Sequence, residues 1–153
     1  MDSLPTILAK HPFLHEFDPR HLPLLAEGAS LVRFDPGQVI SHEGQEAKDF
    51  YLILDGKIAL EALIPSQGQV QFQTIGAGDA LGWSWLFPPF QWHFSSRALE
   101  ASQAVRWDTA ELRAKAEAHP QFGYELARRM TSVLLQRLQA THAQLVDFYG
   151  ASD

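Results

Sequence analysis

The spacing of hydrophobic and polar positions changes twice along the chain. Residues 3–27 are typical of short helices. In the segment DPRHLPLLAEGA, Asp18 suits the N-cap position, Pro19 suits the first helical position, and Gly28 follows the helix end. The pattern therefore predicts a small helical piece at the start of the chain, with one helix beginning after Asp18.

Residues 29–108 contain short strands separated by turns. Asp55-Gly56 is typical of a tight hairpin, and Pro36-Gly37 and Gln67-Gly68 are further turn signals. The predicted strands are 30–35, 38–44, 49–56, 57–64, 69–76, 92–100 and 103–108. Short strands at this spacing predict an antiparallel barrel or jelly roll, so the fold class is mainly β with α: a β-roll flanked by helices.

The period becomes helical from Thr109 onward. The segment 120–150 has Pro120 near its start and Gly150 at its end, which predicts a helix of about 30 residues, or ~45 Å. Its apolar positions lie close to a heptad seam, at Ala127, Met130, Leu134, Leu138, Thr141, Leu145 and Phe148. We expect this seam to pack on a partner helix as a homodimer interface. The alternative is a stripe that packs only on the chain's own roll.

Composition and charge narrow the classes of function. The chain has 153 residues, 46% hydrophobic and 20% charged, which suits one globular domain. The net charge of −6 argues against a large nucleic-acid contact, because such a contact needs a basic face. There is no cysteine, which excludes disulfides and thiolate zinc sites. No apolar run reaches ~18 residues and no signal-peptide pattern is present, so we expect a cytoplasmic protein without membrane contact.

No pattern indicates catalysis or a resident metal. His11 and His15 have the spacing of two ligands on one helix face, but Pro12 lies between them and no carboxylate stands beside them. The segment SSR, residues 95–97, has no base in a recognisable triad arrangement. We expect no enzyme activity, no catalytic residues, no metal and no cofactor. The alternative from another class is a cupin-like metal-dependent enzyme, which would need a histidine cluster that the predicted strands do not supply.

The chain resembles the cyclic nucleotide-binding domain family in three successive blocks, RFDPGQVISHEG, FYLILDGKIAL and IGAGDALG. This family includes the sensor half of bacterial catabolite-activator and fumarate-nitrate regulators. The resemblance covers nearly the whole chain. It implies a single domain over residues 1–153, with N-terminal helices at 1–28, a β-roll at 29–108 and C-terminal helices at 109–150. It also implies a non-catalytic regulatory function, with a cyclic nucleotide as the possible ligand.

The resemblance extends to the segment that binds phosphate in the family. We call this segment, residues 82–97, the cassette. In the family, a glutamate after a glycine binds the ribose hydroxyl, and an arginine beyond a short helix binds the phosphate. Gly82 matches the glycine, but Trp83 stands at the glutamate position and Trp92 or His93 at the arginine position. This predicts a degenerate cassette that binds cyclic nucleotides weakly, differently or not at all. The alternative is a functional site in which Arg97 or His93 holds the phosphate.

The candidate ligand-binding residues combine the cassette with one helix position. His93, Ser95 and Arg97 share strand parity, so we expect them to face one side of the roll. The segment RLQAT resembles the one that places a threonine against the nucleotide base in the catabolite-activator branch, which adds Thr141. The full set is Gly82, Trp83, Ser84, Trp92, His93, Ser95, Arg97 and Thr141.

Two interpretations of the aromatic residues in the cassette stay open. They cap the open end of the roll as core, or they line a reshaped pocket for an aromatic or apolar ligand, or a partner surface. These residues are Trp83, Trp85, Phe87, Phe90, Trp92 and Phe94.

The resemblance also implies partners. In the family, the C-terminal helix pairs with its twofold mate and lies across the ligand pocket, which agrees with the expected homodimer. The transcription regulators continue with a winged helix-turn-helix, which does not follow in this sequence before it ends at Asp153. We therefore expect no direct DNA binding and an output through an unidentified protein partner.

Overall fold

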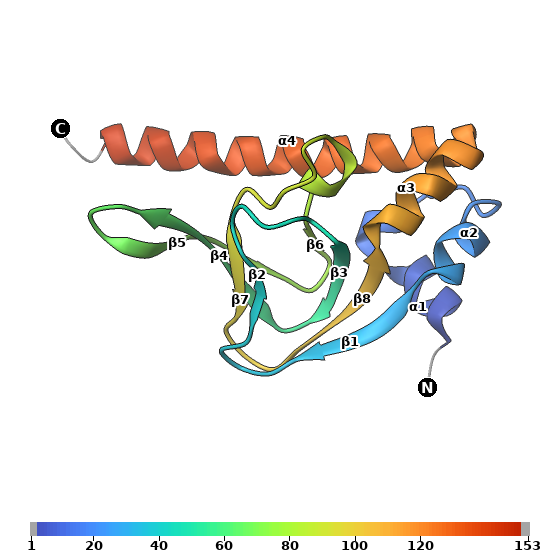
Figure 1. Cartoon of the computed structure of the whole chain (residues 1–153), viewed down its shortest axis with the longest axis horizontal. Helices are drawn as coiled ribbons and strands as arrows, with labels where there is room; N and C mark the ends of the chain where they lie inside the picture. Colours follow the sequence, from blue (N-terminus) through green and yellow to red (C-terminus); the bar gives the residue numbers. More distant parts are fainter. Residues whose placement is uncertain (1–2, 151–153) are drawn as a thin grey trace.

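The computed structural model describes residues 3–150 and shows a β-roll with helices at both ends of the chain (Figure 1). The helices are α1 (Leu4–Lys10), η1 (Pro12–Leu14), α2 (Leu22–Glu27), η2 (Ser84–Leu86), α3 (Thr109–Ala118) and α4 (Pro120–Gly150). The strands are β1 (Ser30–Phe34), β2 (Val39–Ser41), β3 (Asp49–Asp55), β4 (Lys57–Ile64), β5 (Gly68–Gly76), β6 (Ala80–Leu81), β7 (Ser95–Ala98) and β8 (Ser102–Asp108).

The strands form two antiparallel sheets, which confirms the predicted fold class. One sheet has the order β1-β8-β3-β6 and the other β2-β7-β4-β5. The hairpin predicted at Asp55-Gly56 is not formed, because β3 and β4 lie in different sheets and do not pair. Asp55-Gly56 is instead a turn that connects the two sheets, and Gly56 has the positive φ of 104° that this turn requires. The largest buried side chains include Trp85, Trp107 and Phe50, and the Phe50 ring contacts both tryptophan rings in the core.

The strand predicted over 92–100 is shorter than expected, because β7 covers only Ser95–Ala98. The residues before it bond instead to the loop that precedes β3. Trp92 donates its backbone N–H to Gln45 and accepts from Gly44, at 2.8 Å in each case. The hydrophobic alternation of this segment therefore reflects side-chain burial in an irregular loop.

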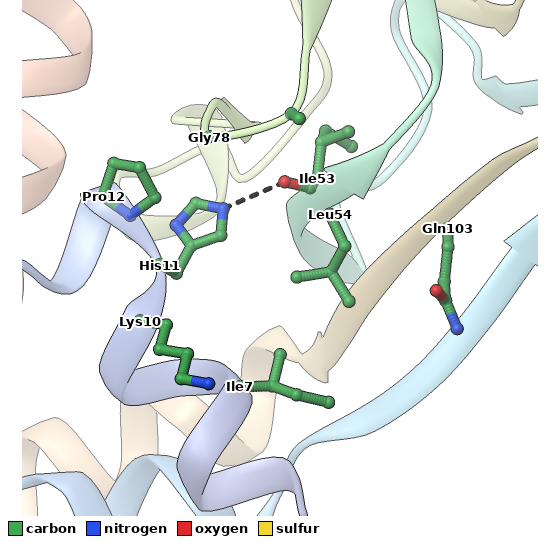
Figure 2. Close-up of a pocket in the computed structure, with 9 residues that line it drawn as sticks. Ile7, Lys10, His11, Pro12, Ile53, Leu54, Gly78 and Gln103 are labelled. Carbon is green, nitrogen blue, oxygen red and sulfur yellow. Dashed lines mark hydrogen bonds between the residues drawn. The ribbon is translucent and has the colours of Figure 1, made fainter. Parts of the chain in front are cut away.

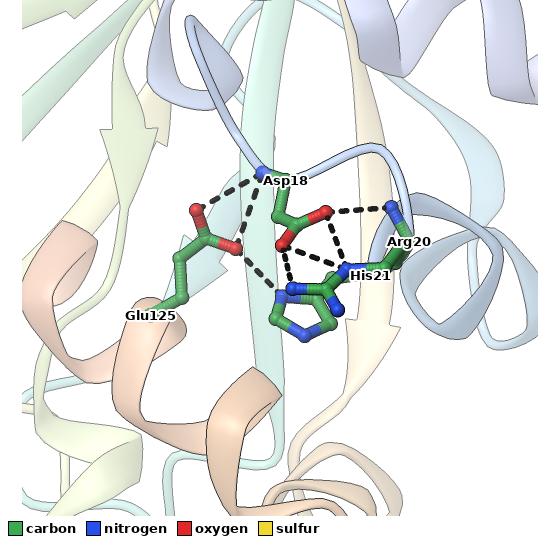
Figure 3. A network of polar contacts seen from close by, with 4 residues as sticks. All are labelled: Asp18, Arg20, His21 and Glu125. Atoms are coloured by element: carbon green, nitrogen blue, oxygen red, sulfur yellow. Dashed lines mark hydrogen bonds and ion pairs between the residues drawn. The ribbon is translucent and has the colours of Figure 1, made fainter.

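The N-terminal helices differ from the prediction at Asp18. The helix that follows, α2, begins only at Leu22, and Asp18 does not cap it. The Asp18 carboxylate instead accepts from the backbone N–H of Arg20 at 2.9 Å and pairs with its guanidinium at 2.7 Å (Figure 3). Glu125 of α4 accepts from the Asp18 N–H at 3.0 Å and lies 2.7 Å from Nδ1 of His21. This network ties the N-terminal piece to the start of α4.

The long helix α4 covers Pro120–Gly150 and begins at Pro120 as predicted. One face of its first half packs on the core through Phe122, Leu126, Met130 and Val133. Residues 141–150 are all exposed. The helix runs along one side of the roll and past the β4–β5 hairpin (Figure 1), where the Gln144 amide donates to the Phe72 carbonyl.

Candidate functional site

The cassette begins where β6 ends. Gly82 has a φ of 107°, a backbone conformation that side-chain-bearing residues rarely adopt. The short helix η2 follows directly, with Trp83 at its N-cap. The glycine turn that the sequence predicts is therefore formed.

The indole of Trp92 fills the space above this turn. Its Cη2 and Cζ3 atoms lie 3.1 and 3.3 Å from the point where a β-carbon on Gly82 would stand. The Cδ1 atom of Trp85 lies 3.7 Å from the same point. Trp92 is 6% exposed and Trp85 is fully buried, so both rings belong to the protein interior.

Further aromatic contacts continue from the cassette across the roll. The Trp92 ring contacts Phe94 at 5.7 Å between centroids, and Phe94 contacts Phe72 of β5 at 6.3 Å. At the surface, Trp83 meets the exposed His93 ring at 4.6 Å. Three of the six aromatic residues are thus core, namely Trp85, Trp92 and Phe94. Phe87 is 49% exposed, and Trp83 and Phe90 are half-buried.

Arg97 is held by a partner on the neighbouring strand. Its guanidinium lies 3.0 Å from the Glu61 carboxylate, and this hydrogen bond raises the pKa of Arg97 above its ordinary value. Side chains alternate along β7, so Arg97 faces away from the side that carries the fully buried Ser96 and Ala98. The guanidinium therefore binds a carboxylate on the outer side of the strand.

His93 does not share the arrangement expected from strand parity. It precedes β7, and its side chain is exposed, whereas Ser95 is buried. The Ser95 hydroxyl accepts from the backbone N–H of Glu43 at 3.0 Å. The prediction that His93 faces the same side as Ser95 is wrong, because the strand begins only at Ser95.

The two remaining candidates have different surroundings. Ser84 is buried, and within residues 3–150 its hydroxyl has no hydrogen-bond partner; the same holds for Nε1 of Trp85. Thr141 is exposed and donates its hydroxyl to the Arg137 carbonyl at 3.0 Å, within its own helix.

Two arginines that were not among the predicted site residues bind backbone carbonyls, one in the cassette and one in β6 just before it. Arg137 of α4 donates to the Ala80 carbonyl at 3.1 Å, and burial lowers the pKa of its guanidinium. Arg113 of α3 donates to the Trp85 carbonyl at 2.6 Å and stacks on the Phe90 ring at 4.1 Å. Arg137 and Arg113 are 57 and 28 residues away from these partners in the sequence, so no local sequence pattern indicates the two contacts.

A hollow lies away from the cassette, beside α1. It has a volume of about 560 Å³ and is lined by residues that include Ile7, His11 and Leu54 (Figure 2). His11 Nε2 lies 3.0 Å from the Ile53 carbonyl, while Nδ1 accepts from the backbone N–H of Phe13. This leaves the proton on Nε2, and burial lowers the pKa of His11. None of the predicted ligand-binding residues lines this hollow.

Comparison with known proteins decides the family. The sequence model of the cyclic nucleotide-binding domain family matches residues 31–119. This range contains the cassette and all eight strands except the first residue of β1. The chain belongs to the cyclic nucleotide-binding domain family. This family consists of regulatory domains that bind cyclic nucleotides, which confirms the resemblance seen in the sequence.

Relatives and solved structures of the cyclic nucleotide-binding type agree with this assignment. The chain is 26% identical over 141 residues to the CRP-like cAMP-activated global transcriptional regulator of Mycobacterium tuberculosis, covering 92% of this chain and 61% of that protein. A putative cyclic nucleotide-binding protein from Geobacter metallireducens is 26% identical, with a TM-score of 0.78 over 90% of this chain and 99% of that one. A cyclic nucleotide-binding domain from Methylobacillus flagellatus shares the fold at 18% identity, with a TM-score of 0.79 over 93% and 80%.

Two further properties concern the described residues only. No group of three or more His, Asp or Glu side chains among residues 3–150 is placed to hold a metal ion. None of the helices in that range combines the length and the apolar character needed to cross a membrane.

Proposed function

We propose that the chain is a non-catalytic regulatory module of the cyclic nucleotide-binding type whose cassette binds cyclic nucleotides weakly or not at all. The observation that carries this proposal is the Trp92 ring packed on Gly82. In the family, this glycine turn presents backbone N–H groups to a phosphate. Here, the space beside the turn holds the protein's own indole.

The chemistry of the replaced residues supports the proposal. Tryptophan offers one N–H donor and no acceptor, so Trp83 cannot accept from a ribose hydroxyl as a glutamate does. Charge-assisted hydrogen bonds contribute about 1.5–3 kcal/mol each. The absence of two of them weakens binding by about two to four orders of magnitude.

The alternative site, with Arg97 or His93 as the phosphate ligand, has less support. Arg97 is already bound by Glu61, and its release would cost that ion pair. His93 is exposed and packs edge-on against Trp83. An exposed imidazole provides a weaker contact to a phosphate than a buried guanidinium, because solvent screens its charge.

We also propose homodimerisation through α4. The second half of this helix carries exposed apolar residues, which we call the open face: Leu135, Leu138, Leu145, Val146, Phe148 and Tyr149. Large exposed apolar residues in a continuous row are typical of a protein interface. The open face keeps Leu138, Leu145 and Phe148 of the predicted seam. Met130 is not part of it, because it is 0% exposed and packs in the core of its own chain, and Ala127, Leu134 and Thr141 are also left out. Leu135, Val146 and Tyr149 take part instead.

The output of the module is proposed to pass through a protein partner, without direct DNA contact by this chain. The net charge of −6 supports this, since nucleic-acid binding needs a basic face. The chain spans 61% of the length of the curated transcriptional regulator that it matches. That protein's activity on DNA is therefore not transferred to this chain.

Calorimetric titration tests the ligand proposal. Purified protein is titrated with cyclic AMP and with cyclic GMP, and the Mycobacterium tuberculosis regulator, which is named as cAMP-activated, serves as positive control. We expect dissociation constants weaker than about 100 µM for this chain. Submicromolar binding of either nucleotide would overturn the proposal and would direct attention to Arg97 and His93.

A further inference from the structure

A small hollow, partly open to solvent, lies where three separate parts of the chain meet. It has a volume of about 160 Å³ and lies between η1, the turn that leads into β6, and the middle of α4. Pro12 and Phe13 form its apolar wall. Pro12 also packs on Gly78 of the turn, 3.2 Å from the point where a β-carbon on that glycine would stand (Figure 2).

Two opposite charges line this hollow and form no ion pair with each other within residues 3–150. The Asp79 carboxylate also interacts electrostatically with Arg137 and His11. Asp79 lies on the turn, and one of its carboxylate oxygens accepts from the Gly76 N–H at 2.9 Å, which orients the group. Arg129 lies on α4 and is half-buried, with its guanidinium 5.8 Å from the Phe17 ring centroid. Within residues 3–150, Arg129 makes no ion pair within 4.0 Å, with Asp79 or with any other carboxylate.

Two neutral polar groups stand beside the arginine. Ser132 and Gln136 line the same hollow from α4, three and seven residues after Arg129. Positions with this spacing lie on one face of a helix. Neither side chain forms a hydrogen bond within the described part of the chain. One wall therefore offers a cation with two hydrogen-bonding groups, and the opposite wall offers a carboxylate.

We propose that this hollow binds a small zwitterion, a molecule with a carboxylate and an ammonium group such as a free amino acid. The ligand's carboxylate binds Arg129 and Ser132, and its ammonium group binds the free oxygen of Asp79. A simple anion is disfavoured because Asp79 faces the same space. The volume is below the ~300–1,000 Å³ of pockets that hold drug-sized molecules, which excludes a nucleotide.

The position of the hollow gives such a ligand a regulatory effect. It contacts the N-terminal piece, the turn two residues before Leu81 and Gly82, and α4 together. A bound zwitterion forms one ion pair with Arg129 and one with Asp79, and so holds these three parts in one arrangement. The site is separate from the space occupied by Trp92, so this inference does not depend on the cassette proposal.

The test uses the whole chain and three zwitterions of increasing charge separation: glycine, β-alanine and γ-aminobutyrate. Acetate and methylammonium serve as single-charge controls. Binding is followed by amide chemical-shift changes in two-dimensional NMR, which also report where the ligand binds. We expect at least one zwitterion to saturate below about 10 mM, with shifts at Gly78–Ala80 and Arg129–Gln136, and both single-charge compounds to bind about tenfold more weakly or not at all.

Matched variants locate the contacts. Arg129→Gln and Asp79→Asn each remove one charge, and the asparagine keeps an acceptor for the Gly76 N–H, so the turn is preserved. Each should weaken the binding about tenfold or more. Arg33→Gln and Asp147→Asn change exposed residues elsewhere and should leave it unchanged.

Three outcomes would overturn the inference. They are the absence of saturable shifts with all three zwitterions, binding that both site variants leave intact, and equal binding of acetate. If Arg129 and Asp79 simply pair with each other in solution, the first outcome follows and both site variants lose stability. A cyclic AMP titration of the same variants reports separately on the cassette.

Discussion

The indole ring of Trp92 covers Gly82, with its Cη2 atom 3.1 Å from the place of an added β-carbon. In most turns, a glycine with positive φ is required only for its backbone conformation. Gly82 is required for a second reason, because its missing side chain makes room for the Trp92 ring. The same glycine that leaves a phosphate site open in the family therefore accommodates a buried aromatic residue here.

This double requirement predicts the effect of Gly82→Ala. The substitution should lower the free energy of unfolding by about 2–4 kcal/mol, because the strained φ and the overpacked ring add. Urea unfolding of the two proteins measures the change. Gly68→Ala is the matched control, since Gly68 has a φ of 77° and no atom within 4 Å of an added β-carbon. It should cost only the backbone strain, about 1–2 kcal/mol. Equal losses for the two variants would contradict the packing argument.

The hydrogen bond from Arg137 to Ala80 joins α4 to β6, so its removal should destabilise both segments. Arg137→Met keeps much of the apolar stem but removes the donor to the Ala80 carbonyl. We expect a loss of about 1–3 kcal/mol, because a buried carbonyl is left without its partner. Hydrogen exchange should accelerate in α4 around residue 137 and in β6. Arg128→Met, at an exposed position on the same helix, is the control and should leave both segments unchanged.

Most of the fold was predictable because its signals are local. The turn at Asp55-Gly56 and Pro120 at the start of α4 both occur where the sequence places them, although the turn connects two sheets and is not the predicted hairpin. The prediction that Asp18 caps a helix is wrong, because an aspartate before a proline suits both a helix cap and a turn. Its carboxylate bonds to Arg20, and the helix begins four residues later.

The site was only partly predictable. The turn at Gly82 follows from the sequence, but whether Trp92 is core or lines a pocket stayed open, because its contact with Gly82 is a tertiary one. The heptad pattern on α4 combined two faces of the helix. Met130 belongs to the face that packs on the roll, and Leu138, 66% exposed, belongs to the open face. A list of apolar positions cannot separate two such faces, because the separation depends on where the roll lies.

His11 predicts a pH dependence of stability near neutrality. Burial lowers the pKa of His11 in the folded chain below its ordinary value of 6.5. Below that value the unfolded chain binds more protons at this residue than the folded chain does, so stability rises with pH. The free energy of unfolding should therefore fall as pH decreases from about 7 to about 5.

Urea unfolding across this range checks the prediction, with His11→Gln as the comparison. The variant should show a smaller slope of unfolding free energy against pH. The Asp18 carboxyl does not interfere, since its hydrogen bonds to Arg20 lower its pKa to about 2. Its contribution is lost only as the pH falls through that value. Identical slopes in both proteins would exclude His11 as the source.

The open face of α4 predicts a dimer that one charge disrupts. Leu138→Glu places an unpaired carboxylate at its centre and should weaken self-association by more than about 100-fold. Sedimentation velocity at about 50 µM distinguishes dimer from monomer. Gln139→Glu adds the same charge at an exposed neighbouring position and should remain dimeric. A monomeric unaltered chain at this concentration would rule out the interface.

The last prediction concerns the restoration of a phosphate site. Trp83→Glu with Trp92→Arg returns to the cassette the two side chains that the family uses, and it removes the ring from above Gly82. Because Gly82 already has the required conformation, affinity for cyclic AMP should rise by about two to four orders of magnitude. Calorimetry measures the change. Trp85 and Trp107 are the two tryptophans that remain, and a change in the fluorescence of Trp85 reports binding close to Gly82.

The control for this restoration is Trp83→Gln with Trp92→Gln, which opens the same space without supplying either charge. Its affinity for cyclic AMP should exceed that of the unaltered chain by no more than about tenfold, because a neutral amide provides weaker hydrogen bonds to phosphate than a guanidinium does.

His93→Arg in place of Trp92→Arg tests which of the two positions, 92 or 93, corresponds to the arginine of the family. The packing of Trp92 on Gly82 favours position 92, so this variant should gain less affinity. If the control and the restored variant gain equally, the aromatic ring alone blocks the site. If neither gains, the backbone N–H groups of the turn are not available to a phosphate, and the two replaced side chains do not limit the affinity for cyclic AMP.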